Sequence, residues 1–231
     1  MSWHEIVERD HDLQNPTSGE KIELVGEYLR LAPRMRVLDI ACGKCGPAIL
    51  LAERFDCSIH GIELRESFAS EGRERVAAAG LTDLVEIEVA NAAEVALEHE
   101  AWDVAVCFGA AFVWGHIGDA AREIVPAVKQ GGGVAIGEPY WRELGREGED
   151  FVDLPATVAR FESAGLDLIG MAAASEDDWD RYESLHWRAA VEEIAAGADA
   201  EFAATHREHV DRHLRWRRTE LGWAIFAGRK R

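Results

Sequence analysis

The residues most able to do chemistry lie together in one short segment, Asp39-Ile-Ala-Cys-Gly-Lys-Cys-Gly46. Its two thiols, Cys42 and Cys45, form a C-x-x-C pair at the mouth of an expected helix, where a thiol pKa falls and dithiol chemistry is favoured. Small dithiol redox domains are much shorter than this chain, and Cys57 and Cys107 supply no second pair for zinc. We therefore expect two small residues in a tight turn and no bound metal.

The glycines of the same segment are typical of two ligand classes. Ala41-x-Gly43-x-x-Gly46 nearly matches the dinucleotide pattern G-x-G-x-x-G, and Glu63 ends the next expected strand. Against a dinucleotide, the Asp39 carboxylate would face the pyrophosphate, and like charges at that distance repel each other. The same carboxylate favours a ligand that carries an ammonium and a sulfonium group.

An alternation of strands and helices must position this segment. Apolar runs bounded by turn residues predict strands at 36–40, 58–63, 84–89, 102–108 and 133–138. Helical spacing predicts helices at 20–31, 47–55, 66–79 and 119–128. Strands that alternate with helices of this length form βαβ units with a parallel sheet, which binds ligands at the carboxyl ends of its strands.

The pattern changes after Glu138. Residues 140–150 are charged and contain glycine, which predicts a surface loop or lid; a helix at 155–164 and a strand at 166–174 follow. Two long helical segments, 176–196 and 201–219, then precede a last strand at 221–227. We expect an α/β fold: a doubly wound, mostly parallel seven-stranded sheet with a helical insertion before the last strand. The chain reads as one domain, 1–231, with an N-terminal cap (1–34), a ligand-binding core (35–139) and a third part with the lid, the helical insertion and the last strands (140–231).

Within these elements, the glycine segment resembles the D-x-G-x-G-x-G motif of the class I S-adenosylmethionine (SAM)-dependent methyltransferases. Asp39, Gly43 and Gly46 match the motif, whereas Ala41 and Cys45 replace two usual glycines and are still small. Four further segments resemble a group of small bacterial methyltransferases: His11-x-x-x-Asn15-Pro16, Gly137-Glu-Pro-Tyr-Trp-Arg142, Trp179-Asp-Arg-Tyr182 and Gly222-Trp-Ala-Ile-Phe226. The resemblance implies a Rossmann-like fold, SAM as cofactor and methyl transfer as reaction.

The resemblance also implies where SAM binds. Glu63 stands where the family has the acid that binds both ribose hydroxyls, and Asn91 where an acid reads the adenine amino group, a role that an amide oxygen can take over. Cys107 and Phe108 follow the fourth strand, where the family lays apolar surface beside adenosine. The expected cofactor contacts are Asp39, Ala41, Cys42, Gly43, Gly46, Glu63, Leu64, Asn91, Ala92, Ala93, Cys107 and Phe108.

Four residues are candidates for catalysis on the acceptor side. Glu138 ends the fifth strand and Tyr140 follows it. If they have no role in catalysis, Glu138 is a solvated residue at a strand end and Tyr140 packs in the core. His11 precedes the first helix, where the family folds a segment over the cofactor, and His116 follows the fourth strand. A base is needed only if the acceptor arrives protonated. We expect the acceptor between the segment around His11, residues 112–116, residues 138–141 and the insertion after Ser175.

Composition limits the partners. The formal net charge is −18, which argues against binding to nucleic acid or an anionic membrane. The longest uncharged apolar stretch, 104–118, is too short to span a bilayer, and the polar N-terminus lacks a secretory signal. We expect a cytoplasmic protein with a small-molecule methyl acceptor. The basic run 206–218 suits either a solvated helix face or a subunit contact, so a homodimer stays open, as does a SAM-binding protein that transfers no methyl group.

Overall fold

Apolar strands buried on both faces form the centre of the molecule. In β1 (Arg36–Ile40) every residue from Val37 to Ile40 is buried, as expected of a parallel strand that helices cover on both sides. The structure is a computed structural model that describes residues 2–143 and 151–231. The other strands of its sheet are β2 (Ser58–Glu63), β3 (Val85–Val89), β4 (Trp102–Cys107), β5 (Val128–Trp141), β6 (Leu166–Ala173) and β7 (Leu221–Lys230).

The strand order confirms the doubly wound topology that the sequence predicts. The seven strands lie in the order β3-β2-β1-β4-β5-β7-β6. Strands β1 to β5 pair in parallel, and β7 runs antiparallel to both β5 and β6. The carboxyl ends of β1, β2, β4 and β5 therefore meet at one edge of the sheet.

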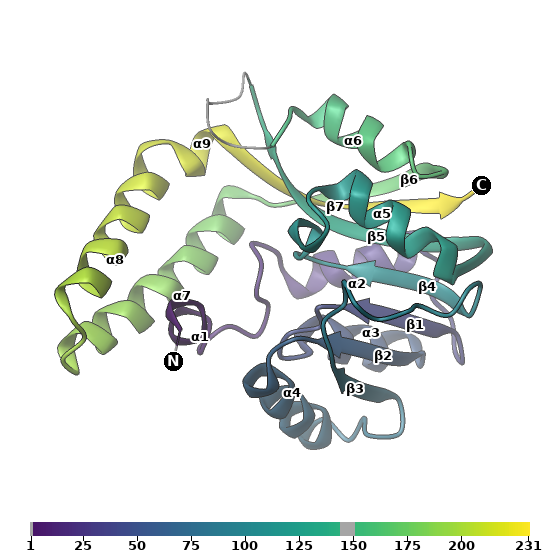
Figure 1. The fold of residues 1–231 in the computed structure, drawn as a ribbon, viewed down its shortest axis with the longest axis horizontal. Helices are drawn as coiled ribbons and strands as arrows, with labels where there is room; N and C mark the ends of the chain where they lie inside the picture. The colour runs from purple at the N-terminus through teal and green to yellow at the C-terminus, as the bar shows by residue number, and fades with distance from the viewer. Residues whose placement is uncertain (1, 144–150) are drawn as a thin grey trace.

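Helices cover both faces of the sheet, and a helical pair extends from one side (Figure 1). The helices α2, α3 and α4 contribute to the hydrophobic core on one face, and α5 and α6 to that on the other. Their bounds, with those of the remaining helices, are α1 (Trp3–Val7), α2 (Gly19–Tyr28), α3 (Gly46–Phe55), α4 (Glu66–Ala78), α5 (Ile117–Ile124), α6 (Leu154–Glu162), α7 (Glu176–Ala195), α8 (Ala200–Arg212) and α9 (Arg218–Glu220).

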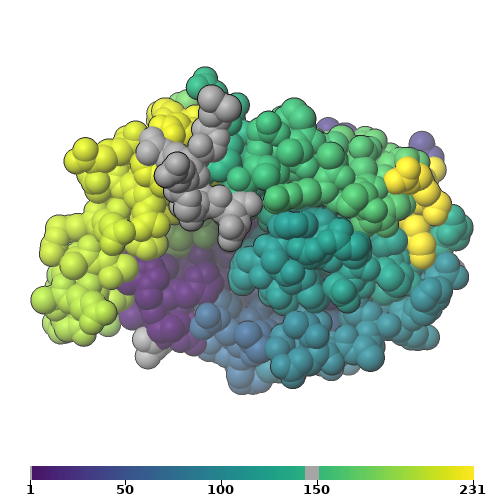
Figure 2. Space-filling view, turned by 45° about the horizontal axis from the view of Figure 1, so that its top comes forward, coloured from purple at the N-terminus to yellow at the C-terminus, as the bar shows by residue number. Residues whose placement is uncertain are grey.

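The expected helical insertion consists of α7 and α8, and the N-terminal helix α1 packs against α7. Capping boxes begin both packed helices: Ser2 pairs with Glu5 in α1, and Ser175 pairs with Asp178 in α7. Figure 2 shows the N-terminal segment, in purple, seated between the yellow-green helix α8 and the blue surface that includes α4. The N-terminal segment and the helical pair α7–α8 thus pack together on one side of the fold.

Three local expectations need correction. The helix α1 has too few residues to leave a periodic signal, and the sequence does not predict it. Tyr140 and Trp141 belong to β5 and not to a loop, because pairing with β7 continues as far as Trp141 opposite Leu221. The expected helix 201–219 is interrupted by a π-helical turn at His213–Arg217. The rest of the predicted lid, residues 144–150, lies outside the described residues.

Within the described part of the chain, none of the helices combines the length and the apolarity that crossing a bilayer requires.

Candidate functional site

The turn after β1 has a backbone shape that ordinarily requires glycine. Ala41, Gly43 and Cys45 have φ values of 55°, 56° and 61°, all in the left-handed region. Only glycine adopts this region without steric cost, which explains why the family motif carries glycines at these positions. The small side chains of Ala41 and Cys45 preserve the turn at some strain.

Glu63, at the end of β2, holds this turn in place. One carboxylate oxygen, Oε2, accepts a hydrogen bond from the Gly43 N–H at 2.9 Å, and Oε1 accepts one from the Arg65 N–H at 2.8 Å. Asp39 is buried at the end of β1, and burial together with the nearby Glu63 charge raises the pKa of Asp39 to about 8. Two buried carboxyl groups side by side favour the binding of a cation.

A cavity of about 370 Å³ opens beside these carboxyl groups. Seven of the expected cofactor contacts line it: Asp39, Ala41, Cys42, Gly43, Glu63, Leu64 and Phe108. We call it the cofactor cavity. Four strand ends were expected to form the cofactor site, and residues at the ends of β1, β2 and β4 line this cavity.

The other expected cofactor contacts do not line this cavity. Gly46 packs against the N-terminal segment, since a Cβ atom there would lie 1.8 Å from the Asp12 carbonyl oxygen. Cys107 is fully buried, and burial raises the pKa of its thiol to about 12. Asn91 bonds within its own turn, because Oδ1 accepts from the Ala93 N–H and Nδ2 donates to Glu94. Ala92 and Ala93, which flank it, also lie away from the cavity lining.

The N-terminal segment contributes residues that the sequence analysis did not assign. Gln14 lines the cofactor cavity, and its Oε1 accepts from the Lys44 N–H at 3.0 Å. Asn15 lies against Gly109, where a Cβ atom would be 2.1 Å from the Asn15 Oδ1. The motif around Asn15 could have pointed to this role. His4 and Tyr182, also in the lining, come from helices whose approach to the sheet has no local sequence signal.

A second cavity, of about 360 Å³, adjoins the first. One part of its lining comes from two segments that the sequence analysis placed around the acceptor: Glu138 and Pro139 of β5, and Phe112, Gly115 and His116 after β4. The opposite wall comes from α1, α7 and the π-helical turn, and includes Trp179, His186 and Arg217. We call it the acceptor cavity.

Glu138, one of the expected catalytic candidates, lines the acceptor cavity and is buried. Its Oε1 accepts a hydrogen bond from the Ile117 N–H at 3.1 Å, at the start of α5. Burial nevertheless raises the pKa of Glu138 to about 7. A carboxyl group with such a pKa exchanges protons near neutral pH, as a general base must.

The other three catalytic candidates have different positions. His116 lines the acceptor cavity but also caps α5, because its Nδ1 accepts from the Gly118 and Asp119 N–H groups. Tyr140 does not line either cavity: it packs in the core with its ring 6.4 Å from that of Phe226. This corrects the expectation that Tyr140 lies on the acceptor side.

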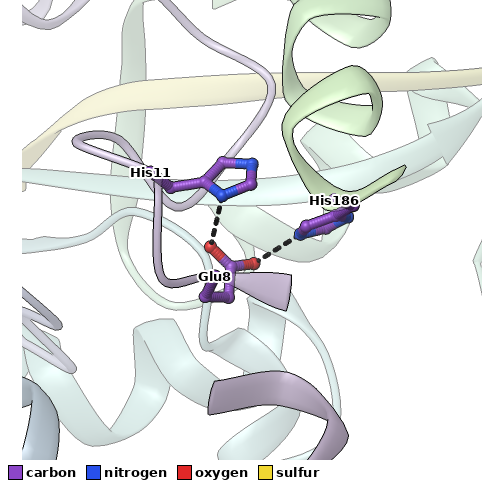
Figure 3. Close-up of side chains that lie close together, drawn as sticks. All are labelled: Glu8, His11 and His186. Atoms are coloured by element: carbon purple, nitrogen blue, oxygen red, sulfur yellow. Dashed lines mark hydrogen bonds and ion pairs between the residues drawn. The ribbon is translucent and has the colours of Figure 1, made fainter. Parts of the chain in front are cut away.

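His11 likewise lines neither of the two cavities, although it lies close to the acceptor side. Its Nε2 lies 2.9 Å from the Tyr182 carbonyl oxygen, and its Nδ1 lies 3.6 Å from Glu8 Oε2. Glu8 in turn accepts a hydrogen bond from the Tyr182 hydroxyl at 2.8 Å. Figure 3 shows its contacts with His11 and with His186, whose Nε2 donates to Glu8 at 2.9 Å. The acceptor cavity is thus backed by a cluster of buried polar groups.

The C-x-x-C pair lacks the environment of a reactive dithiol. All four cysteines are free and buried. A hydrogen bond with Cys45, together with burial, raises the pKa of the Cys42 thiol far above its ordinary range. A thiol that resists ionisation is a poor nucleophile, so the redox interpretation has no support from the geometry.

Comparisons with known proteins agree with this geometry. A family model described as methyltransferase domain matches residues 37–132. The uncharacterized protein YjhP of Escherichia coli K12 is 31% identical, over 96% of this chain and 95% of YjhP. A solved SAM-dependent methyltransferase from Geobacter sulfurreducens, in complex with S-adenosyl-L-homocysteine, is 29% identical with a TM-score of 0.91, over 99% of this chain and 98% of that one. A second, from Thiobacillus denitrificans and with the same ligand, is 30% identical with a TM-score of 0.90, over 98% and 97%.

Proposed function

Because this chain belongs to the class I SAM-dependent methyltransferases and uses SAM, we propose that its methyl acceptor is a small molecule held in the acceptor cavity. The observation that carries the proposal is the contact between the two cavities. Five residues line both of them: His4, Asn15, Gly109, Phe112 and Tyr182. A methyl group on a cofactor in the first cavity would therefore point toward a molecule in the second.

The dimensions and lining of the acceptor cavity favour a small organic molecule. Its volume of about 360 Å³ lies in the range of small-molecule sites. Aromatic walls from the buried Trp179 and Trp223 would exclude water from that side of the reacting atoms. The charge of −18 argues against a nucleic acid as acceptor.

The cofactor cavity fits SAM chemically. SAM carries an ammonium and a sulfonium group, and the buried Asp39 and Glu63 carboxyl groups would balance this positive charge. We assign Asp39 and the Gly43 region to the amino-acid end of the cofactor and Glu63 to the ribose hydroxyls. SAM supplies a methyl group that its sulfonium already activates.

The protein then has mainly to align and, where needed, to deprotonate the acceptor. Phe112 and Tyr182 lie at the junction of the cavities, where they would hold the acceptor in line with the methyl group. Glu138 would accept the proton that the acceptor atom loses, because burial has brought its pKa to about 7. Since only the ionised form can accept a proton, turnover should rise as the pH increases through about 7.

We propose the same division of labour along the chain that the sequence suggests. Residues 1–34 act as a cap that contributes to both cavities, and residues 35–139 carry the cofactor-binding core. Residues 140–231 supply the helical wall on the acceptor side.

A screen of small metabolites with methyl-labelled SAM tests the proposal. In the screen, purified protein should transfer label to at least one compound. Glu138→Gln should then lower kcat for that compound by about 100-fold or more, with SAM affinity retained. Glu123→Gln, which changes an exposed acid of α5, is the matched control and should leave kcat unchanged. Label that appears only on protein or nucleic acid would contradict a small-molecule acceptor, and an unaffected kcat would remove Glu138 as the base.

A further inference from the structure

Glu8, His11 and His186 form a cluster that the methyl-transfer proposal does not use. Their ligand-type atoms, one from each residue, all lie within 4.8 Å of one another. Glu8 and His11 are almost completely buried, with exposed side-chain fractions of 0% and 1%, and His186 is exposed to 16%. Figure 3 shows the two imidazole rings turned toward the one carboxylate, from α7 and from the segment after α1.

The hydrogen bonds of His11 leave two lone pairs facing each other. The Tyr182 carbonyl oxygen can only accept, so His11 Nε2 must carry the hydrogen of their 2.9 Å bond. In a neutral ring, Nδ1 then presents a lone pair to Glu8 Oε2, 3.6 Å away. Neither atom has a hydrogen-bond partner among the described residues. Two buried acceptors at this distance require a positively charged species between them.

The spacing matches the ligands of one metal ion. With bonds near 2.1 Å and a tetrahedral angle, two ligand atoms lie about 3.4 Å apart, close to the 3.6 Å between His11 Nδ1 and Glu8 Oε2. His186 Nε2 lies 2.9 Å from the other carboxylate oxygen, Glu8 Oε1, and the ligand-type atoms of the three residues all lie within 4.8 Å of one another. Two imidazoles and one carboxylate are a common ligand set for divalent ions of the first transition series.

Neighbouring carbonyl, carboxylate and hydroxyl groups orient the three side chains, as such groups usually orient metal ligands. Histidine ligands ordinarily give their second N–H to a carbonyl or a carboxylate, which fixes the ring and its tautomer. Here His11 Nε2 meets the Tyr182 carbonyl. The ion would replace the hydrogen that His186 Nε2 gives to Glu8, and the ring would then carry its hydrogen on Nδ1, which lies 3.9 Å from the Glu183 carboxylate. The Tyr182 hydroxyl donates to Glu8 and holds that carboxylate in turn.

We propose that Glu8, His11 and His186 bind a divalent transition-metal ion through the Glu8 carboxylate, His11 Nδ1 and His186 Nε2. Glu8 and His186 line the acceptor cavity, so the ion would lie in its wall, where an oxygen or nitrogen of the acceptor would complete the coordination. This goes beyond methyl transfer and departs from the expectation of a protein without a metal. The ion site does not depend on which acceptor is used.

Direct metal binding to the full chain is the test. Protein stripped with a chelator is titrated with Zn²⁺ in a calorimeter, and the bound zinc is counted by mass spectrometry after gel filtration. We expect one Zn²⁺ per chain, and Co²⁺ in its place should give the visible absorption of a nitrogen- and oxygen-ligated ion. Glu8→Gln and His11→Gln should each weaken Zn²⁺ binding at least tenfold. His209→Gln, a histidine of the same cavity outside the cluster, should not.

S-adenosylhomocysteine binding by each variant checks that the cofactor half is folded, independently of the metal. If the unsubstituted protein does not bind one Zn²⁺ per chain, the proposal is overturned. A proton on His11 Nδ1 would then be the positive charge between that nitrogen and Glu8 Oε2. Zinc that binds equally well to both cluster variants would also overturn it, because the ion would then be held elsewhere. Neither result would affect the small-molecule assignment, which the labelled-SAM screen tests separately.

Discussion

Glu63 both holds the glycine turn and lines the cofactor cavity. Its two carboxylate oxygens accept hydrogen bonds from the Gly43 and Arg65 N–H groups, and it lines the cofactor cavity. The carboxylate is almost fully buried, so its charge acts at low effective dielectric on whatever binds next to it. A residue of this kind can be recognised in the sequence because it ends a strand whose neighbour carries the glycine turn.

Glu63→Ala should weaken the binding of SAM and of S-adenosylhomocysteine. The change removes a charge-assisted hydrogen bond to the ribose and the anchor of the Gly43 turn, which together correspond to about 1–3 kcal/mol. Isothermal calorimetry measures the effect, with Glu86→Ala, an exposed acid on β3, as the matched control. Equal affinities in the Glu63 variant and the native protein would contradict the assignment.

At the scale of elements, the turn between β1 and α3 shows how a departure from a motif is tolerated. Ala41 and Cys45 take left-handed conformations that cost about 1–2 kcal/mol for a residue with a Cβ atom. The surrounding hydrogen bonds hold the turn despite this cost: the Cys42 N–H donates to the Ile62 carbonyl, and Gly43 is bound by Glu63. The turn thus retains the backbone conformation of the family motif, although Ala41 and Cys45 replace two of its glycines.

Ala41→Gly should therefore raise the free energy of unfolding, by about 0.5–1 kcal/mol, because relief of the strained backbone exceeds the extra entropy of glycine in the unfolded chain. Ala204→Gly, the same change at an exposed position in the middle of α8, should lower it by about 0.5–1 kcal/mol. Urea denaturation of the two variants measures both signs. If both glycines destabilise the protein to the same extent, Ala41 carries no strain.

The elements of the sheet could be predicted from the sequence, because each is an apolar run with turn residues at its ends. β1 and β2 have the expected bounds, and β3 and β4 each differ by one residue at one end. The predictions that failed concern elements whose structure depends on contacts with distant parts of the chain. β5 continues through Tyr140 and Trp141 because β7 pairs with them, and α1 is held as a helix by α7. The same reason explains why Gln14 and Tyr182 were not expected in the cofactor cavity: contacts between the two ends of the chain leave no local pattern.

At the scale of the whole molecule, residues 9–15 tie three parts together. Lys44, in the glycine turn, is buried, and its ammonium donates to the Arg9 carbonyl at 2.8 Å and to Glu71 at 2.9 Å. Gln14 binds the Lys44 N–H, and His11 binds the Tyr182 carbonyl of α7. The cap, the core and the helical pair thus meet at a segment that contributes to both cavities.

Lys44→Met should loosen this segment without unfolding the sheet. Methionine retains the apolar volume of the lysine stem but loses the charged hydrogen bonds, which hold the segment by about 1.5–3 kcal/mol. Amide hydrogen exchange of residues 9–15 should therefore accelerate by about tenfold to a hundredfold, with exchange in β1 and β4 unchanged. If the cofactor binds as proposed, S-adenosylhomocysteine should bind more weakly, because Gln14 and Asn15 line the cofactor cavity. Lys129→Met, which removes a half-exposed surface ion pair, is the control and should alter neither quantity. Equal acceleration in the segment and the sheet would mean that Lys44 supports the fold as a whole and not the closure of the cap over the site.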